Sequence, residues 1–175
     1  VQSALRSAQH LDTRDVEDVQ YRALRTGDID VVDIEADAGF EAPHRILLAD
    51  AAEAAGVQRY VMVSFFNSHM VDGEFPGVDK SEDMYAYFNA KVQADEHLRN
   101  SGLDWTIVGP STLTLDEPTG KIDVQEGTEL SDVPATSRAN VAQVVAAAVD
   151  EDKTIGKQIN FHDGETPVAE ALAAV

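Results

Sequence analysis

The sequence predicts an α/β protein with a mainly parallel β-sheet between two layers of helices. Short runs such as residues 60–66 (YVMVSFF) are apolar almost throughout, which is typical of parallel strands buried on both faces. Segments with apolar residues at helical spacing separate these runs. Strands that alternate with helices favour a parallel sheet with right-handed crossovers. No linker, repeat or low-complexity tract interrupts the pattern, so we expect residues 1–175 to form a single domain.

The first elements become clearer along the chain. Short strands are expected at residues 1–5, 19–24 and 31–34. A helix is expected from Pro43, because proline suits the first turn of a helix. Gly56 is expected to end this helix, since glycine readily adopts the left-handed conformation found after helices.

The alternation continues after the strand at residues 60–66. A helix is expected over residues 84–100, with Ser81 as its cap and Gly102 at its end. The next strand is expected at residues 105–108, closed by Gly109-Pro110. The remaining elements are expected at residues 122–124 (strand), 138–149 (helix), 159–161 (strand) and 168–174 (helix).

The charge excludes several classes of function. With 13 basic and 32 acidic residues the net charge is −19, so nucleic-acid binding and binding to an anionic membrane surface are not expected. No apolar run approaches the ~18 residues of a membrane span. The acid excess is diffuse, which indicates either a surface adapted to salt or a very soluble cytoplasmic protein. No signal peptide is recognisable, and a cytoplasmic location is expected.

Metal chemistry is not predicted. The chain has no cysteine, which excludes disulfides, thiolate metal sites and cysteine nucleophiles. No two of the five histidines have the i, i+4 spacing of a helical zinc pair, and no HExxH motif occurs.

The most informative local feature is the pair Tyr87 and Lys91. Residues at i and i+4 lie on the same face of a helix, one turn apart. A lysine ammonium near a phenol favours the phenolate, and such a tyrosine can exchange a proton with a substrate oxygen. The pair therefore predicts a general acid/base, although Tyr and Lys are also common on half-exposed helices.

Polar residues follow two neighbouring strands and point to the same edge of the sheet. Ser64 ends the strand that precedes the Tyr87 helix, and ligands of open parallel sheets bind outside the carboxyl ends of strands. Ser64 can orient a substrate oxygen, or satisfy a nearby backbone group. Gly109, Pro110, Ser111 and Thr112 follow the next strand and can contact a cofactor through backbone groups, or form an ordinary strand-exit turn.

These segments together resemble the atypical short-chain dehydrogenase/reductases, in particular the NAD(P)H-binding, NmrA-like branch that includes proteins named NAD(P)-dependent epimerase/dehydratase. The resemblance covers about residues 43–175, and its segments occur in the family's order. The segments that carry it are residues 57–64 (VQRYVMVS), 87–98 (YFNAKVQADEHL), 100–108 (NSGLDWTIV), 136–142 (TSRANVA) and 163–172 (DGETPVAEAL).

The resemblance implies a Rossmann-like three-layer fold that binds NADP, with NAD also possible. The family's Tyr-x-x-x-Lys pair falls on Tyr87 and Lys91, and its strand-end serine falls on Ser64. Arg6 resembles the basic residue that meets the 2′-phosphate of NADP, and Asp28 resembles the acidic residue near the adenine.

The chain departs from the family at three places. Many members have a second serine where Phe65 stands, and an Arg-Pro pair where this chain has Gly109-Pro110. None of the 11 glycines forms the G-x-G-x-x-G turn that holds the pyrophosphate. If Val1 begins the second strand of the family's fold, the domain is incomplete at its N-terminus.

The resemblance implies an NAD(P)H-dependent oxidoreductase acting on a small carbonyl- or quinone-like substrate. Two alternatives remain open: a non-catalytic NAD(P) redox sensor that regulates a partner protein, and a sugar-nucleotide epimerase or dehydratase. The sequence does not identify the substrate or the oligomeric state.

Overall fold

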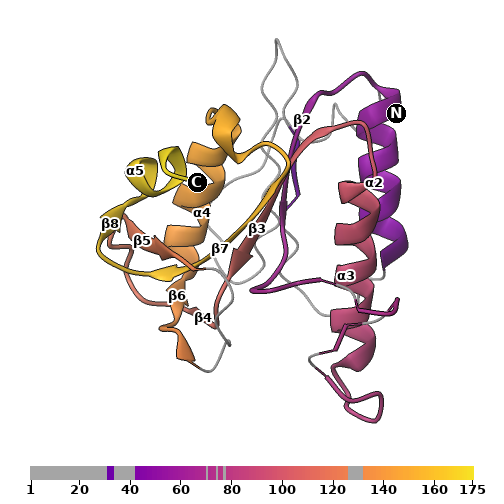
Figure 1. Cartoon of the computed structure of the whole chain (residues 1–175), viewed down its shortest axis with the longest axis horizontal. Coiled ribbons are helices and arrows are strands. Elements are labelled where there is room, and N and C mark those ends of the chain that lie inside the picture. The colour runs from indigo at the N-terminus through magenta and orange to yellow at the C-terminus, as the bar shows by residue number, and fades with distance from the viewer. Residues whose placement is uncertain (1–30, 34–41, 70, 74, 77, 126–131) are drawn as a thin grey trace.

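The computed structural model describes residues 31–33, 42–69, 71–73, 75–76, 78–125 and 132–175. In these residues a six-stranded sheet of order β1-β2-β3-β7-β5-β8 lies between two pairs of helices (Figure 1). The α/β architecture predicted from the sequence is therefore confirmed. The strands are β1 (Val31–Asp33), β2 (Arg59–Val63), β3 (Asp104–Pro110), β4 (Leu113–Thr114), β5 (Lys121–Val124), β6 (Thr136–Ser137), β7 (Lys157–Asp163) and β8 (Thr166–Pro167). The helices are α2 (Ala42–Ala54), α3 (Tyr85–Arg99), α4 (Arg138–Val149) and α5 (Val168–Ala173), with a 3-10 turn at Asp152–Thr154.

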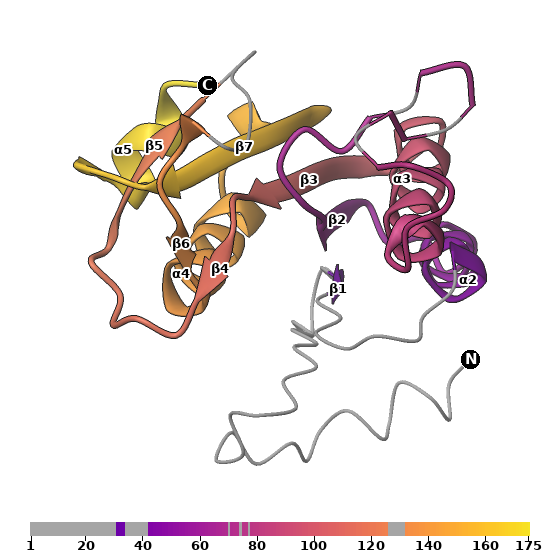
Figure 2. The same cartoon turned by 90° about the horizontal axis from the view of Figure 1, so that it is seen from below.

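The sheet is parallel from β1 to β7 and antiparallel beyond it. β1, β2, β3 and β7 pair in parallel, whereas β5 pairs antiparallel with both β7 and β8. Val63 at the end of β2 lies opposite Val108 of β3. The carboxyl ends of these two strands therefore lie side by side. A separate parallel pair, β4 with β6, lies next to α4 beyond the end of β3 (Figure 2).

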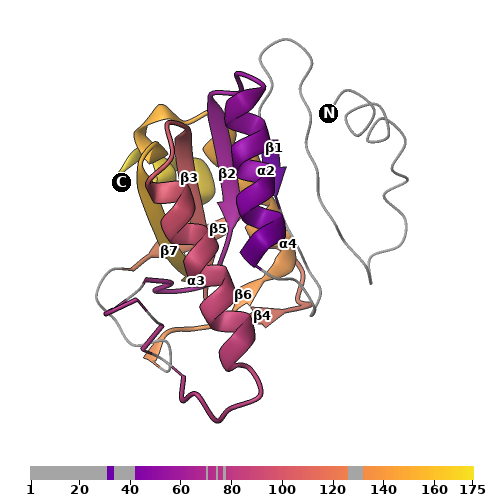
Figure 3. The same cartoon turned by 90° about the vertical axis from the view of Figure 1, so that its right-hand side faces the viewer.

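Alternating side chains of β2 build two separate apolar cores. Tyr60 and Met62 belong to the core beneath α2 and α3, which run side by side across one face of the sheet (Figure 3). Val61 and Val63 belong to the core beneath α4 and α5. Because successive strand residues point to opposite faces, a continuous apolar run supplies both layers.

The buried cation Arg59 ties the start of β2 to the end of α4. Its guanidinium donates hydrogen bonds to the Ala148 carbonyl at 2.5 Å, to Thr154 Oγ1 at 2.7 Å and to Thr106 Oγ1 at 2.8 Å. The last carbonyls of a helix lack partners within the helix, so the arginine satisfies one of them. This residue stabilises the amino-terminal end of the sheet, away from Ser64.

Element boundaries differ from the expectations where loops are held by tertiary contacts. The predicted strand at residues 60–66 ends at Val63, because the chain turns at Asn67, whose φ is 56°. β3 extends through Pro110 instead of stopping at Val108, because β7 offers partners up to Phe161. Gly56 has a φ of 76° just after α2, as expected.

The predicted cap of α3 is wrong. The residue before the helix is Met84, which makes no side-chain capping bond. The Ser81 hydroxyl instead donates to Asp79 Oδ1 at 2.6 Å within the preceding loop. The strands predicted at residues 1–5 and 19–24 lie outside the described residues. Among the helices of the described part, none is both long and apolar enough to cross a membrane.

Candidate functional site

α3 places Lys91 beside the ring of Tyr87. The Lys91 Nζ atom lies 5.3 Å from the centroid of that ring. Lys91 is buried, with 6% of its surface exposed, and Tyr87 is half-buried. A cation over an aromatic ring is attracted to the π electrons of that ring, and low exposure strengthens the attraction because less water screens it. The predicted pair is therefore brought together by one helical turn.

Ser64 is joined to the same helix by an acid that the sequence reasoning missed. Its hydroxyl donates to Asp95 Oδ2 at 2.5 Å, across 31 positions of sequence. Asp95 follows Lys91 by four residues and Tyr87 by eight, so all three lie on one face of α3. This spacing was visible in the sequence, but an acid on a helix is usually solvated, and only packing shows that Asp95 is fully buried.

Burial raises the pKa of the Asp95 carboxyl above its usual range. Loss of solvation is the largest cause, because it penalises the charged form. Hydrogen bonds from Ser64 and Ser68 and the positive charges of Lys91 and Arg99 oppose the rise in pKa. Burial therefore favours the neutral acid at Asp95, whereas the neighbouring hydroxyls and cations favour the carboxylate.

A polar network holds the segment that follows Ser64. Arg99 donates to the Ser68 carbonyl at 2.7 Å and also to the Gln158 side-chain oxygen. Gln158 donates to Ser68 Oγ at 3.1 Å, and Asn160 Nδ2 donates to Asn67 Oδ1 at 3.0 Å. Polar side chains of β7 thus hold the segment that follows Ser64 against the sheet.

The backbone of β3 continues this anchoring. Ser64 N donates to the Val108 carbonyl at 2.8 Å, and Phe66 N donates to the Pro110 carbonyl at 3.0 Å. A Cβ atom at Gly109 would come within 2.5 Å of Asn160 Oδ1 and 3.0 Å of the Phe65 carbonyl. Glycine is therefore required at position 109 by the close approach of these two oxygen atoms.

The residues after Gly109 are mostly engaged inside the fold. Pro110 is buried within β3. The Ser111 hydroxyl donates to the Pro134 carbonyl at 2.6 Å and lies 2.8 Å from Thr136 Oγ1. Thr112 is exposed. The predicted role of these residues toward a cofactor stays a prediction, and any contact made by Gly109 is through its backbone.

Aromatic side chains form a wall beside Tyr87. The ring centroids of Phe65 and Phe88 lie 5.0 Å apart in an edge-to-face arrangement, and Phe75 lies 5.0 Å from Phe65. Tyr87 itself is edge-to-face with Phe88 at 5.4 Å. These rings come from the segment after β2 and from α3, so apolar surface adjoins the candidate acid/base.

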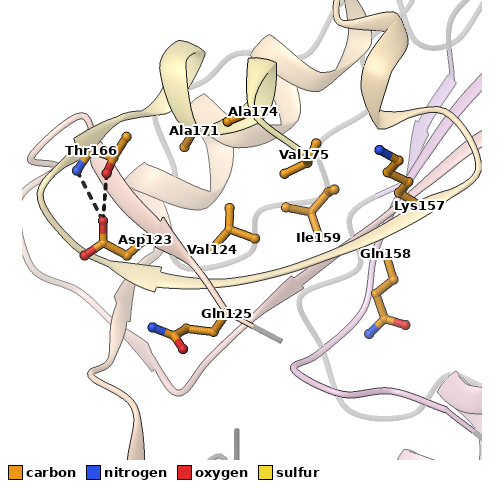
Figure 4. Close-up of a pocket in the computed structure, with 10 residues that line it drawn as sticks. All are labelled: Asp123, Val124, Gln125, Lys157, Gln158, Ile159, Thr166, Ala171, Ala174 and Val175. Atoms are coloured by element: carbon orange, nitrogen blue, oxygen red, sulfur yellow. Dashed lines mark hydrogen bonds between the residues drawn. The ribbon is translucent and has the colours of Figure 1, made fainter. Parts of the chain in front are cut away.

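An open hollow lies elsewhere, between β5, β7 and α5 (Figure 4). None of the predicted site residues within the described part lines it. Its acid, Asp123, accepts hydrogen bonds from the hydroxyl and backbone N–H of Thr166. The hydrogen bond from the Thr166 hydroxyl is the largest cause that lowers the pKa of Asp123. The chemistry-bearing side chains gather at the ends of β2 and β3, and that edge is the better candidate.

Two predicted residues, Arg6 and Asp28, lie outside the described residues. Within the described ranges, no group of three or more metal-ligating side chains comes together.

Comparison with known proteins places the chain among nucleotide-binding proteins. A family profile described as NAD(P)H-binding matches residues 4–152. The chain is 34% identical over 123 residues to the uncharacterized sugar epimerase YhfK of Bacillus subtilis, covering 70% of this chain and 53% of that protein. It therefore spans about half the length of this curated relative.

Two solved structures are similar in fold as well. A putative NAD-dependent epimerase/dehydratase from Bacillus halodurans superposes with a TM-score of 0.71 at 30% identity, covering 83% of this chain and 69% of that one. The oxidoreductase ylbE from Lactococcus lactis superposes with a TM-score of 0.71 at 28% identity, covering 83% and 67%. The Rossmann-like fold that the resemblance implied is confirmed.

Proposed function

Because the chain belongs to the NAD(P)H-binding family, we propose that it is an NAD(P)H-dependent oxidoreductase that reduces a small carbonyl- or quinone-like compound. The observation that carries the proposal is the placement of Lys91 against the Tyr87 ring, with Ser64 tied to the same helix through Asp95. In this proposal Tyr87 is the proton donor, Lys91 is the cation that stabilises the Tyr87 phenolate, and Ser64 supplies a hydroxyl for the substrate oxygen.

The proton chemistry is assigned to side chains of this protein. When bound, the dinucleotide supplies a hydride to the carbonyl carbon. Tyr87 donates its phenolic proton to the oxygen on which charge develops, and Lys91 stabilises the resulting phenolate. Ser64 orients the same oxygen by hydrogen bonding. The aromatic wall of Phe65, Phe75 and Phe88 supports a planar, largely apolar acceptor, because flat rings contact such surfaces well.

The described residues fit a dinucleotide at the carboxyl edge of the parallel strands. Lys91 is a buried cation there, and its ammonium can donate to a ribose hydroxyl. The preference for NADP over NAD rests on Arg6, which resembles the family's 2′-phosphate contact. We expect NADPH to bind more tightly than NADH, which a fluorescence titration of both nucleotides tests.

The test of the acid/base assignment is Tyr87→Phe, assayed with the best substrate found among quinones and small aldehydes and ketones. We expect kcat to fall by about 10²- to 10⁴-fold, because a positioned general acid contributes that much. Tyr85→Phe is the matched control, since Tyr85 is also half-buried and lies two residues away on α3. Wild-type kcat in Tyr87→Phe would remove the assignment, and nucleotide binding without any turnover would favour the redox-sensor alternative.

A further inference from the structure

Asp95 has an unusual environment for a carboxyl group. It is 0% exposed, and its Oδ2 atom lies 2.5 Å from the Ser64 hydroxyl. Its other oxygen, Oδ1, is buried and makes no hydrogen bond of ordinary length and angle among the described residues, although the Ser68 hydroxyl lies near enough to the carboxyl to favour its charged form. A buried carboxylate needs several hydrogen bonds or a close ion pair, because loss of solvation is costly. One fully buried oxygen without a bond is easier to accommodate in the neutral acid.

The groups around Asp95 come from two elements. On α3, Lys91 precedes it by one turn and Arg99 follows by one turn, and both positive charges favour the carboxylate. The segment after β2 contributes the hydroxyls of Ser64 and Ser68. α2 brings one more cation to this region, since Arg45 donates to the Val63 carbonyl, next to Ser64, at 3.0 Å. Burial opposes these hydrogen bonds and positive charges, because it favours the neutral form of the carboxyl.

The direction of the Ser64–Asp95 hydrogen bond decides what Ser64 can do. A hydroxyl carries one proton and two lone pairs. If Asp95 is ionised, it can only accept a hydrogen bond. The Ser64 hydroxyl then donates its proton to Asp95 and cannot donate it to the substrate oxygen. If Asp95 is protonated, it donates to Ser64 Oγ, and the Ser64 proton remains free for the substrate oxygen. The distance of 2.5 Å fits either arrangement.

We propose that Asp95 is a positioning residue that acts through Ser64. As the carboxylic acid, Asp95 donates the short hydrogen bond to Ser64 Oγ, which leaves the Ser64 hydroxyl free to donate to the substrate oxygen. As the carboxylate, Asp95 accepts the hydrogen bond from Ser64, and Ser64 can no longer donate to the substrate. The inference rests on the proposed function, since it concerns the oxygen that Tyr87 protonates. The carboxyl group does not touch the substrate, and its proton is not consumed in the reaction.

The kinetic test compares pH profiles of kcat in the wild type, Asp95→Asn and Asp95→Ala. In the wild type, kcat should fall as the pH rises through the ionisation of Asp95. Asp95→Asn should keep most of the low-pH rate and lose this fall, because an amide N–H donates to Ser64 Oγ at every pH. Asp95→Ala should lower kcat at least about tenfold, because an unanchored donor stabilises the oxyanion less well. Glu96→Gln, the same change one residue away, should keep the wild-type profile.

A double-mutant cycle tests whether Asp95 acts through Ser64. In the Ser64→Ala background, Asp95→Ala should cause no further loss of kcat. An undiminished loss in that background overturns the proposal, as does an Asp95→Asn profile identical to the wild type. The KM for the nucleotide should change little in Asp95→Asn, and circular dichroism verifies that each variant is folded.

A measurement that needs no turnover separates this inference from the proposed function. The γ-carbon signal of Asp95, followed by NMR across pH, should titrate above the ordinary value of about 3.9. The midpoint should rise further in Ser64→Ala, because the hydrogen bond that Ser64 donates to the carboxylate is stronger than the one that it accepts from the neutral acid. An ordinary midpoint, or one that Ser64→Ala leaves unchanged, overturns the inference. If the Asp95 midpoint is raised and rises further in Ser64→Ala, but Tyr87→Phe keeps wild-type activity, the proposed function is wrong and the link between Asp95 and Ser64 still stands.

Discussion

Two buried side chains at the carboxyl edge of the sheet, Ser111 and Lys91, have different neighbours. The Ser111 hydroxyl donates to the Pro134 carbonyl and contacts Thr136, and the serine is only 5% exposed. Lys91 is equally buried, yet its ammonium lies against the Tyr87 ring. The sequence made both residues site candidates, Lys91 through its pairing with Tyr87 and Ser111 through its place after a strand, and their neighbours in the structure differ.

Ser111→Ala should therefore reduce stability more than nucleotide binding. We expect the free energy of unfolding to fall by about 1–3 kcal/mol, since the Pro134 carbonyl loses a buried donor. The Kd for NADPH should stay within a few-fold of the wild type, because this segment is expected to contact a nucleotide through its backbone. Urea denaturation and nucleotide titration measure the two effects. Thr112→Ala, at the exposed neighbour, should change stability by less than about 0.5 kcal/mol. A large loss of binding with unchanged stability would assign the Ser111 hydroxyl to the nucleotide.

At the scale of elements, β7 and β3 hold the segment after β2 in place. Gln158 and Asn160 of β7 form hydrogen bonds with this segment, and the Pro110 carbonyl of β3 accepts a hydrogen bond from Phe66 N. Ser64 and Phe65 are therefore positioned by strands that follow them by some 40 to 100 residues. The hydrophobic pattern located β2, β3 and β7, but polar contacts between strands are not periodic and leave no pattern in the sequence.

Gly109→Ala should disturb this arrangement. The added Cβ would meet Asn160 Oδ1 at 2.5 Å and the Phe65 carbonyl at 3.0 Å, and neither can move without shifting the network. We expect a loss of about 1–3 kcal/mol in the free energy of unfolding, as for other overpacked sites, together with a lower kcat.

Gly102→Ala is the matched control for this substitution. Its Cβ would meet only the side chain of Glu53, with the nearest atom, Oε1, at 2.6 Å, and this flexible end can swing away at little cost. Equal loss of stability in the two variants, measured by urea denaturation, would show that close approach at Gly109 does not constrain the segment after β2.

At the scale of the whole molecule, the net charge of −19 sets the response to salt. Acidic residues repel one another across the surface, and the Debye length shrinks from about 10 Å at 0.1 M to about 3 Å at 1 M salt. We expect the free energy of unfolding to rise between these concentrations of NaCl, on the order of 1 kcal/mol. KCl should act equally; a response to sulfate alone would indicate solute exclusion instead of screening. Stability that is flat or falls with NaCl would contradict a surface adapted to salt.

The sequence by itself determined the alternation of strands and helices, because apolar runs and helical spacing are local properties of the chain. It also determined the Tyr87–Lys91 pair, since one helical turn brings those residues together whatever surrounds them. The cap of α3 could not be read correctly, because Ser81 bonds within its own loop instead of to the helix.

Only the tertiary structure decided which polar groups meet. Ser64 and Asp95 are 31 positions apart, and they come together because α3 packs its buried face against the end of β2. The same packing removes water from Asp95 and raises the pKa of its carboxyl. Burial and long-range contact depend on how elements pack against one another, so no local pattern in the chain records them.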